Sequence, residues 1–388
     1  MSLKAKGKSQ KAKVKNEKRS AATSAFTFIF CLLPFAFCLR RKALAFCLLP
    51  FAFIVAPPQA AQQTSTAPTQ TPTPADGETV VSIETDATNV LLSATDKKRR
   101  FVTTLRPEDI RLLEDGVPQQ ISYFERETDA PLSLALLVDT SASQEKVMQD
   151  ERDAASAFIR SVLRPDKDTA SVLSFTGITR LDQPTTNDAA KLLNAIGALE
   201  VRYTVRSPEC KDREAPQEVR LRCGTAVWDA VTISIEEVLS KTPERTRRAI
   251  ILLSDGDDYD SHVRVYQAAE DAVRNNTVVY SVGIRDKHFE LGSLRRDLLS
   301  NIAEQTGGRA FFPKNPADLA AAFSTIEQEL RSQYFISYTP TNRSKDGSFR
   351  KLQIEIANPE LRKQDLRLLY RQGYYAKQTR NAERGTLN

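Results

Sequence analysis

The sequence predicts an α/β protein whose centre is a doubly wound, mostly parallel six-stranded sheet, flanked by a β-sandwich that the N- and C-terminal segments form together. Between residues 129 and 333, short apolar runs alternate with stretches of helical periodicity, which is typical of strand–helix–strand crossovers. On either side, residues 79–128 and 334–377 contain short segments in which apolar and polar residues alternate. Neither flank has many strands by itself, so we expect the two flanks to pair.

The first 60 residues are interpreted as a leader. Two apolar runs, Ala25–Leu39 and Ala43–Val55, contain the same octapeptide, FCLLPFAF, and a basic segment precedes the second run. Both runs are shorter than the ~20 residues that span a bilayer. Small residues follow near Ala60, so the pattern predicts a signal peptide and an exported protein that is secreted, periplasmic or on the cell surface. An uncleaved anchor is the alternative, and in that case the chain would contact a membrane.

The basic character of the chain belongs to this leader. The 388 residues carry a formal net charge of +6, but the first 42 contain eleven Lys and Arg against one acid, so the remainder has a net charge of −4. A mildly acidic body with one Trp and no basic patch rich in aromatic residues predicts no binding to nucleic acid. Residues 61–78 are rich in Pro, Thr and Gln, which is typical of a flexible linker.

The strands of the two flanks are placed by alternation and by turn signals. We expect strands before the central region at 79–85, 90–95, 110–114 and 119–125, and after it at 334–338, 349–356 and 366–370. The dipeptide Asp115-Gly116 predicts a turn that joins 110–114 to 119–125. Residues 378–388 are expected to form a tail.

In the central region, strands and helices are expected to alternate along the chain. Apolar runs predict strands at 132–139, 170–175, 248–253, 278–284 and 309–312, with 178–181 pairing antiparallel. Apolar residues at helical spacing predict helices at 145–163, 189–199, 226–240, 263–275, 294–305 and 316–331. A charged insertion that contains Pro, residues 201–223, interrupts this pattern.

Oxygen-bearing side chains follow two of the buried runs. LSLALLVDTSAS ends in Asp139, Ser141 and Ser143, and RAIILL is followed closely by Asp255. Ligands of a doubly wound sheet collect outside the carboxyl ends of its strands. A D-x-S-x-S loop alone is also typical of a helix N-cap. However, all of these side chains offer oxygen, which hard divalent cations such as Mg²⁺ prefer, so the sequence predicts a metal site.

These residues resemble the von Willebrand factor type A (VWFA) domain, whose metal-ion-dependent adhesion site combines D-x-S-x-S, a distant Thr and a distant Asp. Asp139, Ser141 and Ser143 match the first element, Thr225 the second and Asp255 the third. With its flanks, EDGVPQQISYF and RQGYYA, the chain is more narrowly similar to VWFA-related proteins of the Acidobacteria type. The resemblance implies that the three hydroxyls contact a divalent cation, with Mg²⁺ the first candidate and Mn²⁺ or Ca²⁺ the others. Both Asp residues then bind directly or through water.

The resemblance implies binding chemistry and no reaction. A position on the cation remains for the Glu or Asp of a protein partner, so the leading expectation is an exported, cation-dependent adhesion-type module that is not an enzyme. A metal-free structural scaffold is the alternative. A phosphoryl-transfer enzyme with Asp139 as nucleophile is less favoured. Such chemistry usually needs a second carboxylate where this chain has Ser141, and no Gly-rich phosphate loop is present.

The other residues that could carry a function are cysteines, acids, histidines and a tryptophan outside the motif. Cys210 and Cys223, the cysteines that remain after the leader, are expected to form a disulfide, with two free thiols as the alternative. Asp257, Asp258 and Asp260 are interpreted as a solvated acidic loop, with residues behind the metal ligands or a weak additional cation site as the alternative. The two histidines, His262 and His288, lack the spacing of a zinc peptidase motif, and Trp228 is expected to pack in the core.

Overall fold

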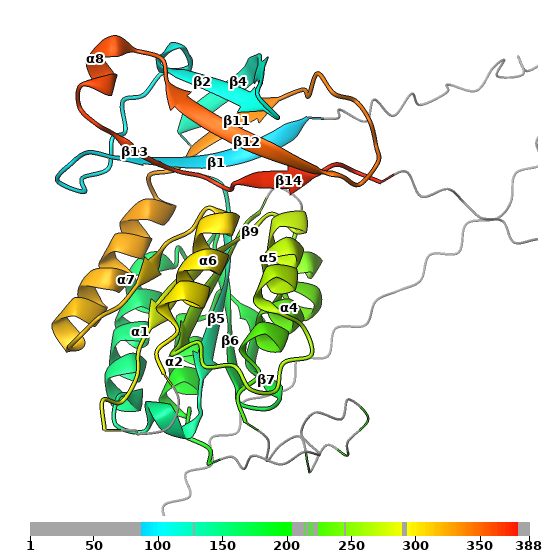
Figure 1. Ribbon diagram of the computed structural model, residues 1–388. Coiled ribbons are helices and arrows are strands. Elements are labelled where there is room, and N and C mark those ends of the chain that lie inside the picture. The colour runs from blue at the N-terminus through cyan, green and yellow to red at the C-terminus, as the bar shows by residue number, and fades with distance from the viewer. Residues whose placement is uncertain are drawn as a thin grey trace, which may run out of the picture. The chain divides into compact units, whose positions relative to one another are not determined.

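The computed structural model describes residues 87–126, 129–203, 214, 216, 219, 224–243, 246–288 and 293–378 (Figure 1). The chain divides after Glu78, and all described residues belong to the unit Thr79–Asn388. The expected leader, linker, first strand and most of the tail lie outside the described residues, as do Cys210 and Cys223. Among the residues described, no helix is both long and apolar enough to cross a membrane.

The centre is a six-stranded sheet with the order β10-β9-β8-β5-β6-β7. Neighbouring strands are parallel except β7, which runs antiparallel to β6, as the sequence predicts. The strands are β5 (Leu132–Asp139), β6 (Thr169–Phe175), β7 (Thr179–Thr186), β8 (Arg247–Ser254), β9 (Thr277–Gly283) and β10 (Ala310–Phe311).

Helices cover both faces of this sheet, which confirms the doubly wound fold class (Figure 1). In β5, Leu134, Leu136 and Val138 belong to one buried apolar cluster and Ala135 and Leu137 to the other, because successive strand residues point to opposite faces. The first cluster includes residues of α1 (Met148–Val162), α2 (Ala189–Gly197) and α7 (Pro316–Leu330). The second includes residues of α4 (Val227–Glu237), α5 (Val265–Arg274) and α6 (Arg296–Thr306).

The two flanks pair into a β-sandwich, as expected. One sheet has the order β13-β1-β11-β4 and the other β14-β12-β2-β3, so each contains strands from both ends of the chain. Their facing residues form one apolar cluster. The strands are β1 (Thr88–Thr95), β2 (Ile110–Glu114), β3 (Val117–Gln119), β4 (Ile121–Arg126), β11 (Tyr334–Tyr338), β12 (Phe349–Ile356), β13 (Arg367–Leu369) and β14 (Gly373–Tyr375). A short helix, α8 (Pro359–Arg362), follows β12.

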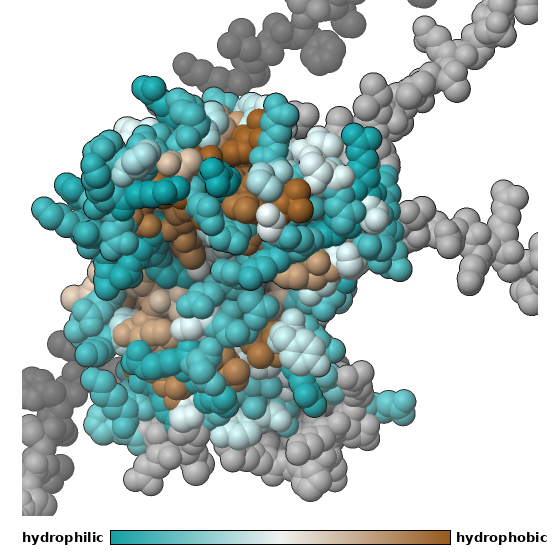
Figure 2. Space-filling model, turned by 45° about the horizontal axis from the view of Figure 1, so that its top comes forward, coloured by the Kyte–Doolittle hydropathy of each residue, from teal (hydrophilic) through white to brown (hydrophobic). Residues whose placement is uncertain are grey.

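The surface of this unit is mixed in character. On the face shown in Figure 2, hydrophobic residues form patches among hydrophilic ones. Large apolar side chains exposed among the described residues are Val117, Tyr123, Leu181, Tyr203, Tyr259, Tyr266 and Phe349. Because scattered apolar side chains are normal on protein surfaces, this exposure by itself indicates no binding face.

The sandwich adjoins the amino ends of the central strands. Arg371, which precedes β14, donates from Nη1 to Oδ1 of Asn276, the residue before β9, at 2.7 Å. The backbone N–H of Gln372 donates to the carbonyl of Gln305, near the end of α6, at 3.2 Å. The carboxyl ends of the strands, where ligands of such sheets bind, therefore lie on the side away from the sandwich (Figure 1).

A buried Asp–Arg pair connects the start of β5 to the end of α1. Asp168 is 1% exposed, and its carboxylate accepts from the Arg164 guanidinium at 2.8 Å and from the Leu132 N–H at 3.0 Å. Burial by itself would raise the pKa of Asp168, but the hydrogen bonds from Arg164 and Leu132 outweigh it and hold the pKa below its ordinary value.

Replacing Asp168 with Asn is expected to lower the free energy of unfolding by about 2–3 kcal/mol, since Arg164 loses its nearest carboxylate but keeps Asp129 at 3.8 Å and remains partly in water. Because the folded pKa is depressed, the stabilisation is complete above the unfolded pKa of about 4 and is lost as the pH falls through the folded value. Urea unfolding at pH 7 and pH 3 measures this. The exposed Asp166→Asn is the control, and an equal effect of Asp168→Asn at both pH values would contradict the assignment.

Candidate metal centre

The first part of the site is the loop that leaves β5. Asp139 is fully buried, and each of its oxygens has a donor: the Ser141 N–H at 2.9 Å and the Ser254 hydroxyl at 2.7 Å. The hydroxyl oxygens of Ser141 and Ser143 lie 3.1 Å apart. These contacts orient the loop so that its alternate side chains point to one place.

Asp255, which follows β8, lies next to this loop. Ser254, the residue before Asp255, donates its hydroxyl to Asp139 at 2.7 Å, which brings the end of β8 against the loop. The Ser143 side chain hydrogen-bonds to Asp255, and the charge of Asp255 acts on Asp139. Gly256 has a φ of +74°, and a Cβ there would lie 2.9 Å from a side-chain carbon of Leu299, so the turn after Asp255 requires glycine. The structure therefore brings Asp139, Ser141, Ser143 and Asp255 together.

Thr225 lies at the same edge of the sheet and is held there by backbone hydrogen bonds. Its carbonyl accepts from the N–H groups of Tyr259 and Asp260, in the loop after Asp255, at 2.9 and 3.1 Å. The next N–H along the chain, that of Ala226, donates to Thr176 O at 2.8 Å, and Thr176 directly follows Phe175, the register partner of Asp139. These hydrogen bonds connect the Thr225 backbone to the loop after β8 and, through Ala226, to the end of β6.

The site is negatively charged and shielded from water on its carboxylate side. Burial, followed by the charge of Asp255, raises the pKa of Asp139, and burial likewise raises the pKa of Asp255. Asp139 and Asp255 are 0% and 2% exposed, whereas Ser141, Ser143 and Thr225 are each 6% exposed. All five residues are therefore buried, and the two acids are the more deeply buried.

This donor set fits a hard divalent cation. All five side chains offer oxygen, two of them as carboxylates, and their crowding in a buried place is unfavourable without a compensating positive charge. Within the described ranges, no group of three or more His, Cys, Asp and Glu side chains is arranged to hold an ion. An ion at this edge would therefore depend on the hydroxyls as well as on the two Asp residues.

Two charged residues of the site were not predicted from the sequence. Arg285, in the loop after β9, donates from Nη1 to Asp255 Oδ2 at 2.9 Å, and its side chain is 11% exposed. Glu151, in α1, is 1% exposed and interacts electrostatically with both Asp139 and Asp255. The sequence could have indicated Glu151, because it is a charged residue at a position of α1 that lies on the buried stripe of the helix. Arg285 has no comparable signal.

The acidic loop after Asp255 is not simply solvated. Asp258 is largely buried, and its carboxylate accepts from the Val227 N–H at 2.8 Å and from the Ser261 hydroxyl. Burial raises the pKa of Asp258 to about 6. The expectation of a solvated loop is wrong for this residue, because Asp258 supplies the N-terminal acceptor that α4 lacks in its own N-cap, Ala226.

The two histidines and the tryptophan make contacts within the fold. His262 Nδ1 lies 2.7 Å from an Asp229 oxygen, and His288 Nδ1 lies 3.1 Å from an Asp286 oxygen, so each histidine has one acid beside it. Trp228 is buried in the apolar cluster of α4, as expected.

No protein-family model matches the chain, and no curated protein is significantly similar to it in sequence. Solved structures similar to it include von Willebrand factor type A domain proteins, the family that the sequence motif resembles. The von Willebrand factor type A protein of Catenulispora acidiphila is 15% identical, with a TM-score of 0.42 over 70% of this chain and 74% of that one. BatB of Bacteroides thetaiotaomicron is 17% identical, with a TM-score of 0.38 over 52% of this chain and all of that one. Proximal thread matrix protein 1 of the mussel byssus, solved with a zinc-occupied MIDAS motif, is 15% identical, with a TM-score of 0.41 over 56% of this chain and 50% of that one.

Proposed function

We propose that this chain is an exported, divalent-cation-dependent module that binds a protein partner through one of the partner's acidic side chains. The observation that carries the proposal is the meeting of Asp139 and Asp255 with the hydroxyls of Ser141 and Ser143 at the carboxyl edge of the sheet. Export is inferred from the leader, which lies outside the described residues.

In this proposal the five residues hold the ion. Ser141, Ser143 and Thr225 contribute hydroxyl oxygens, and Asp139 and Asp255 contribute charge, directly or through water. The cation, once bound, supplies a positive centre that attracts a carboxylate of the partner. Because three of the five ligands are neutral, the cation is less neutralised than in a site made of carboxylates alone. We expect Mg²⁺ as the ion before Mn²⁺ or Ca²⁺.

A basic cavity beside the site supports an acidic partner. It has a volume of about 220 Å³ and lies between the start of α1 and the loop after β9. Its wall includes Arg285, which also contacts Asp255, so the cavity and the site share this residue. The charged residues that line it are Lys146, Arg285, Lys287 and Lys314 against Asp150 and Asp286. Because Arg285 is paired with Asp255 and Lys146 with Asp286, the attraction of acidic segments comes mainly from Lys287 and Lys314.

The geometry favours binding over phosphoryl transfer. A nucleophilic aspartate must reach its substrate, but Asp139 is fully buried and both of its oxygens accept hydrogen bonds. Asp139 is therefore better suited to orienting the loop and balancing a cation than to attacking a phosphorus atom. The metal-free scaffold remains the second candidate, and a chelator distinguishes the two.

Selection of displayed random peptides tests the proposal. The full chain is presented with Mg²⁺, and bound peptides are eluted with EDTA. We expect the eluted peptides to contain Asp or Glu, and replacement of that acid with Ala should reduce binding at least about tenfold, as loss of a charged contact does. The Asp255→Ala variant is the control and should retain none of these peptides. Peptides whose binding survives EDTA would support the scaffold instead.

A further inference from the structure

Glu151 occupies a position on α1 where an apolar residue is expected. The buried residues of this helix are Met148, Glu151, Ala155, Phe158, Ile159 and Val162, which form the stripe that packs against the sheet. Every other member of the stripe is apolar. A charged side chain here is not required by the packing of the helix, since an apolar side chain would pack equally well.

Glu151 has a second unusual property, because its carboxylate lacks partners. Neither Oε1 nor Oε2 has a hydrogen-bond partner among the described residues, and Gln144 Oε1, one loop earlier, is also buried without one. The other buried acids of this unit differ: Glu329 receives the Tyr280 hydroxyl at 3.0 Å, and Asp168 pairs with Arg164. A buried carboxylate without a donor is costly, so its retention needs a reason.

The surroundings of Glu151 supply that reason. The acids that act on it are Asp139, Asp255 and Asp150, and together with burial they raise its pKa well above the ordinary value. Arg285 compensates one charge of the set through Asp255. Glu151 is therefore a further acid beside Asp139 and Asp255, and of these two only Asp255 is paired with Arg285.

We propose that Glu151 is a positioning residue of the cation site, supplying from α1 a third negative charge that strengthens binding of a divalent cation without touching it. The inference rests on the proposed function. Glu151 is placed behind the ligands and not among them. In the part of the chain that the structure describes, Glu151, Asp139 and Asp255 are not arranged as a group of three that could hold an ion. Its unpartnered oxygens are acceptors for water that accompanies the ion.

Calorimetric titration of Mg²⁺ into the full chain tests this, with variants Glu151→Gln and Glu151→Asp. Gln keeps the shape and removes the charge, so the affinity for Mg²⁺ should fall about tenfold, as for other residues behind the ligands of a metal. Asp keeps the charge and should retain most of the affinity. Glu329→Gln, the same change at a buried acid that already has partners, should leave the affinity unchanged.

Thermal unfolding provides a readout that does not depend on calorimetry. In EDTA, Glu151→Gln should melt no lower than the wild type, because the change removes a buried carboxyl group whose oxygens have no hydrogen-bond partner among the described residues. On addition of Mg²⁺, the variant should gain less in melting temperature than the wild type. A wild-type affinity retained within twofold by Glu151→Gln, or an equal loss in Glu151→Asp and Glu151→Gln, would overturn the role of Glu151 and leave the proposed function intact. Absence of Mg²⁺ binding by the wild type would overturn both.

Discussion

Replacing Asp255 with Ala is expected to reduce the affinity for Mg²⁺ at least about 100-fold, or nearly 3 kcal/mol. The change removes one of the two carboxylates of the site. It also leaves Arg285 without the carboxylate that it contacts at 2.9 Å, so a guanidinium charge would repel the incoming cation. Both effects act in a buried place where water screens charges poorly. Calorimetric titration of Mg²⁺ into both proteins measures the change.

Asp257→Ala is the matched control for this prediction. Asp257 lies two residues further along the same loop, and its carboxylate accepts from the Ser293 N–H and the Tyr259 hydroxyl. Its nearest oxygen is 3.9 Å from Arg285 Nη1, so removal of this acid tests whether any loss of local charge suffices. We expect the control to keep its affinity within about threefold, since Asp257 is not one of the five residues of the site and its carboxylate already has these two donors. An Asp255→Ala variant that binds Mg²⁺ as tightly as this control would contradict the role of Asp255.

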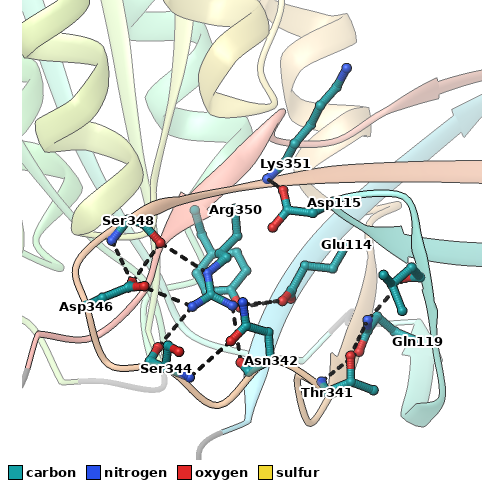
Figure 3. A network of polar contacts seen from close by, with 12 residues as sticks. Glu114, Asp115, Gln119, Thr341, Asn342, Ser344, Asp346, Ser348, Arg350 and Lys351 are labelled. Carbon is teal, nitrogen blue, oxygen red and sulfur yellow. Dashed lines mark hydrogen bonds and ion pairs between the residues drawn. The ribbon is translucent and has the colours of Figure 1, made fainter.

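Replacing Arg350 with Met is expected to lower the free energy of unfolding by about 3–5 kcal/mol. Arg350 and Glu114 are buried in the sandwich, with Nη1 and Oε1 3.4 Å apart, and Arg350 also donates to the carbonyls of Asn342 and Ser344 (Figure 3). Glu114 lies in β2 and Arg350 in β12, so the pair joins the two flanks of the chain. Loss of the guanidinium leaves the Glu114 charge buried, with only the hydroxyls of Tyr338 and Tyr374 as donors among the described residues.

The double variant Glu114→Gln/Arg350→Met separates charge from packing. If the cost of the single change comes from the buried charge of Glu114, neutralising that residue should recover at least about 1 kcal/mol. Urea unfolding followed by circular dichroism measures both variants. An Arg350→Met protein that unfolds within about 1 kcal/mol of the wild type would show that the pair contributes little to joining the flanks.

Much of the central fold could be predicted because its strands are buried on both faces. The runs at 134–138 and 249–253 contain only apolar residues, and helical periodicity follows each. The antiparallel strand β7 was placed correctly, but it extends from Thr179 to Thr186, beyond the predicted 178–181. It is an edge strand with no fully buried residue, so its sequence has no apolar run to mark its length.

The sandwich was predicted correctly in outline, but the prediction of one connection was wrong. Asp115 and Gly116 both have positive φ, 49° and 82°, and make the expected tight turn, but the turn joins β2 to the short β3. The predicted partner strand, observed as β4, pairs instead with β11 in the opposite sheet. The three-residue strands β3 and β14 are too short for alternation to be visible in the sequence.

The site could be predicted as far as its motif extends. Asp139, Ser141 and Ser143 share one loop, and the carboxyl ends of parallel strands bring Asp255 beside them. Glu151 and Arg285 could not be placed in advance, because their proximity to these acids depends on how α1 and the loop after β9 pack over the edge of the sheet. The N–H of Asp286 donates to the Ser143 carbonyl at 2.9 Å, a contact between loops that are far apart in sequence.

A crystal of the full chain soaked in Mn²⁺ and measured at the manganese absorption edge tests the central claim most directly. We predict one anomalous peak at the carboxyl edge of the sheet, within ligand distance of the hydroxyls of Ser141, Ser143 and Thr225. A well-ordered edge with no peak there at millimolar Mn²⁺, or a peak bound only by residues outside this set, would contradict it.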